Sequence, residues 1–524
     1  MKNAVIHNIS ERLKNASGIR RDQQKNLDSL IRISNKFHTD ANIEPGPENP
    51  VSEKLFVLES GHQPNFFPYP GVWKKVFLLH QIKEHLNDHG HDAIAVFGFL
   101  DQNLSTAKLL YENKIPAVNK QGKKKFGFKI KESEKWKQFN TLKKPSKDEW
   151  EQELNNLKDY YTQYLPKENI GSDISIQNID SLTEIMETCY SRAENLADLN
   201  AFIFAGICQG LFDISVNFFR YSDVQQNQLF RDEWQKILDS LQDYIRIYNT
   251  TIREKELNLS HVSNGFFPFW YHCTCGVKVA LTQDTMSDYK GTCPACKTEF
   301  SFTLNVDDNH LAGHMKHMGL SAVARNVIVS EGLGTHLFVS GSGGGLQYGK
   351  VANEISRNLC LNIPLTLSWS SRDYYIGIIH RVALNDTLRF FNLTYEDLIS
   401  GQFNEKITNY RISLKKEIET MKPSPENRKD LGKYSGLYQS SATQLTIARN
   451  MFSTIPSIID LLINFPASFI IHQWNSALNC AEIEDSGEIV LIKKDILYHQ
   501  ENTGKFTLPD IPRIYHSLDL IDGL

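Results

Sequence analysis

Apolar residues along the chain follow two different periods, and together they predict an α/β protein. The run KLFVLES at 54–60 is apolar and β-prone, which indicates a buried strand. In the segment VWKKVFLLHQIKEHLNDHG that follows, apolar residues recur every three or four positions, as in a helix. A second apolar run, AIAVFGFL at 93–100, ends at the polar DQN of 101–103. The order strand, helix, strand predicts a parallel sheet.

The same pattern returns in the second half of the chain, in HLFVS, a glycine-rich stretch, the helical pattern KVANEISRNL and the apolar IPLTLSW at 363–369. We therefore expect an α/β fold with a Rossmann-like core that is split into two halves. The expected segments are a helical lead-in (1–50), the first half of the core (51–147), a helical insertion (148–260), a cysteine-rich insertion (261–305), the second half of the core (306–400) and a helical C-terminal region (401–524), which the loop KPSPENRKD at 422–430 interrupts.

Two strand ends are candidate sites, because ligands of open α/β sheets bind where strands end and helices begin. The first is SGHQPNFFPYPGVWKK at 60–75, where a glycine marks a tight exit from the strand and His62 and Gln63 follow it. The second is the DQN stretch, which places Asp101 at the end of a parallel strand.

The glycine-rich stretch SGSGGGLQYG at 340–349 follows one expected strand and precedes a helix. Such a loop lets backbone N–H groups approach a phosphate at a helix N-terminus. It is not a Walker loop, because the required GKS or GKT is absent. A flexible turn and an anion site both remain open readings of the glycines.

Four cysteines form the strongest local signal. Cys273, Cys275, Cys293 and Cys296 lie in two pairs separated by a hairpin-sized spacer, a pattern that suits tetrahedral zinc bound by four thiolates. The first pair is one residue tighter than usual, so His272 is an alternative ligand in place of one thiolate. A closed site with four ligands is structural, because no position stays open for water. We expect a zinc ribbon.

Composition narrows the class of partner. The chain has 524 residues, which predicts two to four domains, and a net charge of −4, so no global field favours nucleic acid or an anionic membrane. Neither an apolar run of membrane-spanning length nor the pattern of a signal peptide is found, so we expect a cytoplasmic protein without membrane contact.

Four of these features, in chain order, resemble the cysteine-adding ligases of bacillithiol biosynthesis (the BshC family). They are the GHQP junction, the strand with its DQN exit, the stretch RNVIVSEGLGTHLFVSGSGGGLQYG, and IPLTLSW. The segment HQPNFFPYPGVWKKV is also similar to the start of the WbqC-like family.

The resemblance implies a core similar to class I aminoacyl-tRNA synthetases and nucleotidyltransferases, and a C-terminal coiled coil that makes a homodimer contact. It implies that cysteine is joined to a sugar-linked amine. It also places His62 and Gln63, with Gly61 and Asn65 beside them, at a nucleotide, and keeps Tyr348 after the glycine loop. Gly344 or Gly345 takes the place of the family's loop glutamate, which leaves an inactive scaffold of the same fold as an alternative.

We expect a ligase that forms an amide between an amino acid and an amine-bearing sugar or small molecule. Amide formation in water needs an activated carboxylate, so ATP or a pre-activated acyl donor is expected. His62 and Gln63 would contact phosphate or the developing oxyanion, and Asp101 would orient or deprotonate the amine. The backbone of the loop residues would hold the nucleotide: Gly341, Ser342, Gly343, Gly344 and Gly345.

Lys74 and Lys75 are further candidate phosphate partners. The rival prediction is a zinc-ribbon protein that binds nucleic acid or tRNA, with lysines of 120–147 on phosphates. The balanced net charge speaks against this rival.

Overall fold

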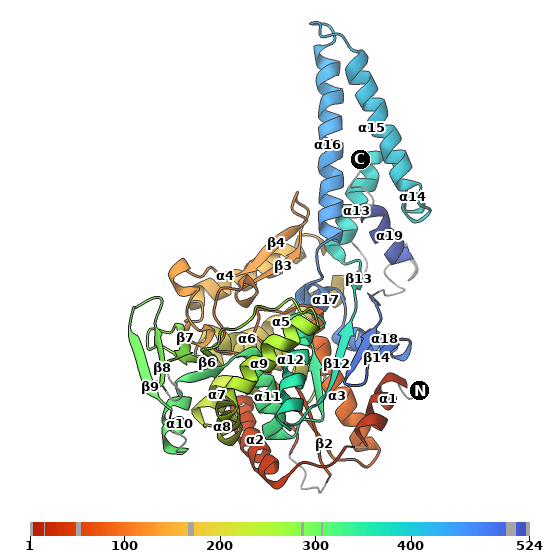
Figure 1. Cartoon of the computed structure of the whole chain (residues 1–524). Coiled ribbons are helices and arrows are strands. Elements are labelled where there is room, and N and C mark those ends of the chain that lie inside the picture. Colours follow the sequence, from red (N-terminus) through yellow and green to blue (C-terminus); the bar gives the residue numbers. More distant parts are fainter. Residues whose placement is uncertain are drawn as a thin grey trace.

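A seven-stranded sheet forms the centre of the computed structural model, which describes residues 4–14, 16–48, 54–165, 172–284, 288–304, 308–498 and 510–519 (Figure 1). Its strands lie in the order β14-β15-β12-β11-β1-β2-β5, and neighbours are parallel except for β14 and β15. The strands are β1 (Phe56–His62), β2 (Ala93–Phe99), β5 (Asn217–Arg220), β11 (Leu337–Ser340), β12 (Leu365–Ser370), β14 (Glu482–Asp485) and β15 (Ile489–Lys493).

The order of the parallel strands is that of dinucleotide-binding Rossmann folds. Counted along the chain, the six parallel strands lie 3-2-1-4-5-6 across the sheet. The chain therefore builds outward from β1 in one direction and from β11 in the other, so the order reverses between these two strands. The prediction of an α/β, Rossmann-like core in two halves is confirmed at this level.

Apolar side chains of β1 point alternately to the two faces of the sheet, and both faces are covered. Phe56 and Leu58 belong to one hydrophobic core, and Leu55 and Val57 belong to the other. The first core includes helices α1 (Ala4–Leu13), α3 (Pro70–Asp88), α6 (Leu196–Gly210) and α18 (Ala467–Asn479). The second includes α2 (Arg21–Ala41), α8 (Arg231–Asp239), α9 (Leu241–Glu254), α11 (Ala322–Leu333) and α12 (Gly344–Asn358). Parallel sheets need this two-sided cover.

The insertions follow β2 and β5, so they begin at the carboxyl ends of these two strands (Figure 1). After β2 come a two-stranded hairpin and helices: β3 (Glu112–Pro116), β4 (Lys123–Gly127), α4 (Lys147–Thr162) and α5 (Ser172–Arg192), with single turns η1 (Lys108–Leu110), η2 (Glu132–Glu134) and η3 (Phe139–Thr141). After β5 come α7 (Tyr221–Gln226), α8 and α9, and then a five-stranded antiparallel sheet. It consists of β6 (Phe266–His272), β7 (Lys278–Gln283), β8 (Asp288–Thr292), β9 (Glu299–Thr303) and, after α10 (Asp308–Met315), β10 (Met318–Leu320). We call β6–β9 the cysteine ribbon.

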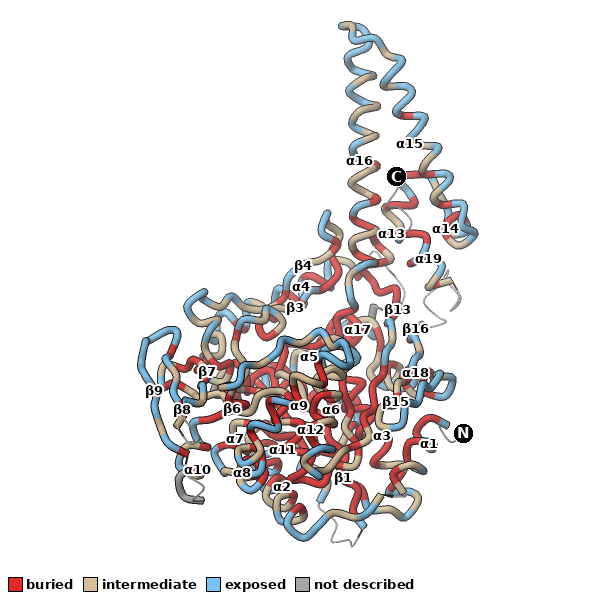
Figure 2. Tube along the Cα trace, in the orientation of Figure 1, coloured by how far each residue is buried: buried red, intermediate tan, exposed pale blue. Residues whose placement is uncertain are grey.

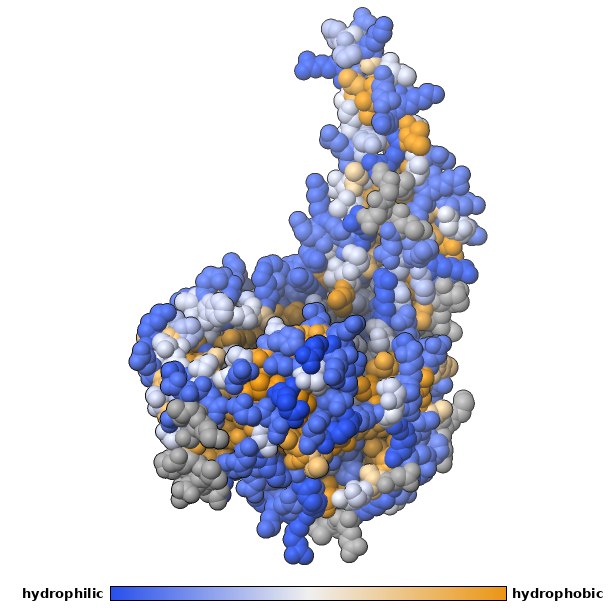
Figure 3. All heavy atoms as spheres, in the orientation of Figure 1, coloured by the Kyte–Doolittle hydropathy of each residue, from blue (hydrophilic) through white to orange (hydrophobic). Residues whose placement is uncertain are grey.

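Two long helices project from the body as a hairpin: α15 (Phe403–Thr420) and α16 (Arg428–Phe452) (Figure 1). Exposed residues dominate the hairpin, in contrast to the buried centre of the body (Figure 2). Apolar atoms appear along it among hydrophilic ones (Figure 3), and its Ile412 is 58% exposed. The remaining C-terminal elements are α13 (Ile378–Phe391), α14 (Tyr395–Ile399), α17 (Ile458–Asn464), α19 (Asp510–Asp519), β13 (Asp373–Tyr375) and β16 (Ile496–Tyr498).

Two segment predictions need correction. The insertion expected to be helical contains β5, and the C-terminal region expected to be helical contributes β14 and β15 to the central sheet. These strands have only four or five residues, too few for periodicity to distinguish a strand from part of a buried helix.

No helix in the described ranges has both the length and the apolar character that crossing a bilayer requires.

Candidate functional site

The two candidate loops meet at the edge of the sheet where the strand order reverses. β1 and β11 are parallel neighbours, with Ser60 opposite Val339. β1 ends at His62 and β11 at Ser340, so the His62–Gln63 bend and the glycine loop leave the sheet side by side. In Rossmann-like folds, ligands bind outside the carboxyl ends of the strands at this reversal. These segments, far apart in the sequence, therefore lie together in the fold.

The glycine loop leads directly into a helix. α12 begins at Gly344, with Gly343 as its N-terminal cap and Tyr348 one turn later. Ser342, Gly343 and Gly344 are exposed. A Cβ atom on Gly345 would lie 2.7 Å from the Ser340 hydroxyl oxygen, so a side chain there would displace that hydroxyl. Since the first amides of a helix have no helical acceptor, this loop offers N–H donors to an anion.

Lys75 lies between the two loops. Its Nζ donates to the Gly61 carbonyl oxygen at 3.2 Å, and a Cβ atom on Gly341 would lie 3.8 Å from the same Nζ. Lys75 is only 8% exposed and, in the part of the chain that is described, no carboxylate lies within ion-pair distance of it. Burial, with the nearby Arg325, lowers the pKa of Lys75 to about 8.

Lys74, the other lysine named from the sequence, has a structural role instead. Its Nζ forms a buried ion pair with Asp373 at 2.9 Å, and the hydroxyl of Tyr498 donates to the same carboxylate at 2.9 Å. Lys74 is therefore not available to a ligand.

His62 is neutral, and its tautomer is fixed. Burial, together with the charge of Lys75, lowers the pKa of His62 to about 3. Its Nδ1 lies 2.9 Å from the Gln63 carbonyl oxygen, which can only accept, so Nδ1 carries the proton and Nε2 is an acceptor. His62 therefore supplies no positive charge and no donor at Nε2, which argues against the expected contact with an oxyanion. The neighbouring Asn65 is buried, and its Oδ1 has no hydrogen-bond partner among the described residues.

A second cation, Arg325 of α11, is held above the end of β2. Its guanidinium lies 5.7 Å from the centre of the Tyr221 ring. The Tyr221 ring in turn passes over Gly98, where a Cβ atom would approach to 2.4 Å, so only glycine fits. Beneath Arg325, Glu59 is buried and accepts a hydrogen bond of 2.8 Å from Thr335, and burial raises the pKa of Glu59 to about 7.

Asp101 lies at the carboxyl end of β2, as the sequence predicts. It is 1% exposed and accepts a hydrogen bond of 3.0 Å from the Ser222 backbone and one of 3.3 Å from Asn140. Burial raises the pKa of Asp101 to about 6, although the bonds from Ser222 lower it. Asp101 can therefore act as a base near neutral pH.

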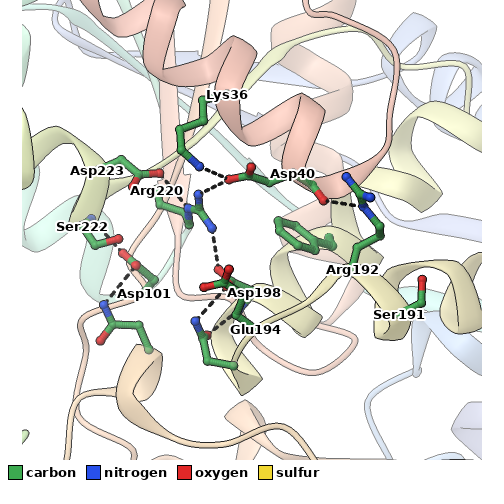
Figure 4. Close-up of a pocket in the computed structure, with 13 residues that line it drawn as sticks. Lys36, Asp40, Asp101, Ser191, Arg192, Glu194, Asp198, Arg220, Ser222 and Asp223 are labelled. Carbon is green, nitrogen blue, oxygen red and sulfur yellow. Dashed lines mark hydrogen bonds and ion pairs between the residues drawn. The ribbon is translucent and has the colours of Figure 1, made fainter.

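A polar cleft of about 500 Å³ opens on one side of Asp101 (Figure 4). Its centre is Arg220, at the end of β5, which forms ion pairs of 2.6 Å with Asp40, 2.8 Å with Asp198 and 2.7 Å with Asp223. Burial lowers the pKa of Arg220, but these carboxylates outweigh it and raise the pKa above its usual value. Five carboxylates and three cationic side chains line the cleft, so it favours a cationic ligand.

Positive charge gathers on the other side of Asp101. A narrow cavity of about 30 Å³ there is lined by Gln102, Asn103 and Tyr221, and by the cations Lys278 and Arg325, with no carboxylate among its described lining residues. Lys278 belongs to β7 of the cysteine ribbon, which places this part of the ribbon against the Rossmann-like core.

The four cysteines come together as predicted. Their Sγ atoms lie within 4.8 Å of one another, with Cys273 and Cys296 at 3.4 Å and Cys275 and Cys293 at 3.6 Å. Four thiolates around a tetrahedral zinc ion are separated by roughly 3.8 Å, given Zn–S bonds of about 2.3 Å. The group can thus hold a metal ion such as zinc. His272 points elsewhere, with its Nδ1 3.4 Å from Gln225, so the alternative ligand set is not supported.

Sequence reasoning missed three charged residues of this region: Arg220, Lys278 and Arg325. Arg220 and Lys278 lie in segments that were expected to be insertions, and Arg325 is separated by more than 100 residues from the strand end that it approaches. No local motif therefore marks any of the three. One usable signal was the position of Arg220 directly after the apolar pair Phe218–Phe219, as expected at a strand end.

No known family model matches the chain, and a search of curated proteins finds no significant match.

Proposed function

We propose that the protein is a ligase that uses ATP to join the carboxyl group of an amino acid to an amine-bearing sugar or other small amine. The observation that carries this proposal is the separation of charge across Asp101. Lys75 beside the glycine loop, and Arg325 and Lys278 beside the narrow cavity, have no ion-pair partner among the described residues, and a cleft rich in carboxylates lies on the other side of Asp101.

The cationic side suits the phosphates of ATP. Lys75 and Arg325 would bind phosphate oxygens, and the amides of Gly343, Gly344 and Gly345 would add uncharged donors at the start of α12. Positive charge at this position also stabilises the negative charge that accumulates when a carboxylate attacks a phosphorus atom of ATP, the new O–P bond forms, and the P–O bond to the leaving ADP or pyrophosphate breaks.

The acidic cleft suits the amine. A protonated amine would be attracted by Asp198 and Asp223, and Asp101 at the boundary would accept the proton that makes the nitrogen a nucleophile. The nitrogen then attacks the activated acyl carbon, the C–N bond forms, and the C–O bond to phosphate breaks. The neutral Nε2 of His62 is an acceptor and would orient an N–H or O–H group of a substrate.

In this proposal the metal is zinc, and it is structural. All four positions of a tetrahedral ion would be filled by Cys273, Cys275, Cys293 and Cys296, so no site remains for a catalytic water. The resemblance to cysteine ligases makes cysteine the first amino acid to test.

The test is product formation from ATP, amino acids and an amine-bearing sugar such as glucosamine, with the amide detected by mass spectrometry and phosphate or pyrophosphate release measured alongside. Lys75→Met should lower turnover at least 100-fold, since it removes the charge between the two loops. Lys83→Met is the matched control: Lys83 is also a buried lysine of α3, but it donates to Ser215 at 2.9 Å, away from both loops.

Two results would contradict the proposal. One is the absence of ATP consumption with every amino acid and amine. The other is equal turnover by Lys75→Met and the wild type.

A further inference from the structure

The cysteine ribbon makes two connections to the region around Asp101. The first is a side chain: Lys278, the first residue of β7, lines the narrow cavity together with Arg325. Lys278 is also close enough to Asp101 for that carboxylate to influence its charge. No ion pair of Lys278 occurs within the described ranges.

The second connection runs through the backbone. The knuckle between Cys273 and Lys278 docks on segment 137–141, where the Gln138 amide donates to the Gly276 carbonyl oxygen at 2.7 Å. Gly276 has a φ of +89°, and a Cβ atom there would lie 3.1 Å from the Thr141 hydroxyl oxygen, so the knuckle needs glycine at this contact.

Segment 137–141 in turn holds the loop that carries Asp101. The Asn140 amide donates to the Asp101 carbonyl oxygen at 2.9 Å, and the Phe139 amide donates to the Asn103 carbonyl oxygen at 2.8 Å. The Asn140 side chain adds its bond to the Asp101 carboxylate. A short chain of hydrogen bonds thus joins the cysteine knuckle to the end of β2.

Metal binding by the cysteines would fix both connections. The knuckle contributes Cys273 and Cys275, and Lys278 follows after three residues. A tetrahedral ion that also binds Cys293 and Cys296 would tie the two ends of the ribbon together and restrict the position at which β7 begins.

We infer that the cysteine ribbon is part of the anion site: Lys278 is its third cation beside Lys75 and Arg325, and the metal-bound knuckle holds Lys278 and the Asp101 loop in place. This inference rests on the proposed function for the chemistry of the ligand, a phosphate-bearing anion. It adds that the metal supports ligand affinity as well as the fold of the ribbon.

The experiment measures the affinity of the full chain for inorganic pyrophosphate by calorimetry, with metal content determined for each sample. Lys278→Met should weaken binding about tenfold, the effect of losing one charge-assisted hydrogen bond, with metal content unchanged. Lys290→Met is the matched control, since Lys290 lies on β8 of the same ribbon and pairs with Asp284 at 2.9 Å. It should bind pyrophosphate as the wild type does.

Metal removal supplies the second arm. A chelator should weaken pyrophosphate binding to the wild type by at least the factor seen for Lys278→Met, and it should weaken binding to Lys278→Met by a smaller factor. Hydrogen exchange at residues 100–103 and 137–141 should speed up in the metal-free wild type, while the strands β1 and β11 stay protected.

The outcomes separate this inference from the proposed function. If Lys75→Met loses pyrophosphate binding but Lys278→Met and the chelated protein bind as the wild type, the ribbon has no part in the site and the inference is overturned alone. If the wild type itself does not bind pyrophosphate, the proposed function and the inference fall together.

Discussion

Charged side chains form ion pairs on one side of Asp101 and lack such partners on the other. In the acidic cleft, Arg220 is surrounded by Asp40, Asp198 and Asp223 in three ion pairs of 2.6–2.8 Å. On the other side, the buried Lys75 and the half-buried Lys278 and Arg325 have no such partner among the described residues. Paired charges hold a structure together, whereas an unpaired buried cation costs stability and is typical of a ligand site. Arg220 therefore holds the acidic cleft together, and the three carboxylates around this single cation leave the cleft with an excess of negative charge.

The largest expected effect comes from breaking the paired side. Arg220→Met leaves Asp198 and its neighbours without a counter-charge in a buried position, so the free energy of unfolding should fall by about 3–5 kcal/mol. Urea denaturation measures this loss. Arg246→Met is the control, because the exposed pair of Arg246 with Asp243 should contribute less than about 0.5 kcal/mol. Equal effects of the two substitutions would contradict the structural role of Arg220.

Removing a cation from the unpaired side should instead raise the free energy of unfolding. The pKa of Lys75 is lowered to about 8, from 10.5, so its charge destabilises the fold at neutral pH by about 3 kcal/mol. Lys75→Met should therefore raise the free energy of unfolding at pH 7 by about 1–3 kcal/mol, since the bond to Gly61 is lost at the same time. A destabilised Lys75→Met protein would show that Lys75 is structural, like Lys74.

The same group sets the pH dependence of stability. Between pH 8 and pH 10.5 the unfolded chain binds the Lys75 proton and the folded chain does not, so wild-type stability should rise with pH relative to Lys75→Met. The comparison is made by denaturant titrations of both proteins at pH 7, 8, 9 and 10. Parallel curves for the two proteins would contradict the lowered pKa.

A smaller and graded effect is expected on turnover. In the proposed mechanism Asp101 must be ionised to accept a proton, and its pKa is about 6; Lys75 must be protonated to bind phosphate, and its pKa is about 8. The pH profile of kcat/KM should therefore rise through pH 6 and fall through pH 8, by up to tenfold per pH unit on each side. The titration of His62 should cause no change in kcat/KM above pH 5, because its pKa is about 3. Asp101→Asn should remove the acidic limb together with most of the activity.

Much of the fold could be predicted from the sequence, and the reason is length. β1, β2 and β12 are six or seven residues long, with apolar runs and clear turn signals, and α3 has a helical period over 19 residues. β5 and β15, which complete the sheet, are too short for such a signal. Their assignment requires knowledge of the neighbouring strand, and that information is not local.

The site could be predicted in part, for a related reason. His62, Asp101 and the glycine loop lie at strand ends, so the pattern of strands alone marks them. Lys74 and Lys75 could not be separated, because adjacent helical residues differ only by the partner that each one meets in the fold. Arg325 and Lys278 come from a helix and a ribbon whose docking on β2 no sequence pattern specifies.

The central claim is that ligands of opposite charge bind on the two sides of Asp101. The most direct test is calorimetric titration of one sample with pyrophosphate and with glucosamine, with neutral N-acetylglucosamine as the uncharged comparison, for the wild type, Lys75→Met and Asp223→Asn. The account predicts that both charged ligands bind together, that Lys75→Met loses only pyrophosphate and that Asp223→Asn weakens only glucosamine. Competition between the two ligands, or loss of both in either variant, would contradict it.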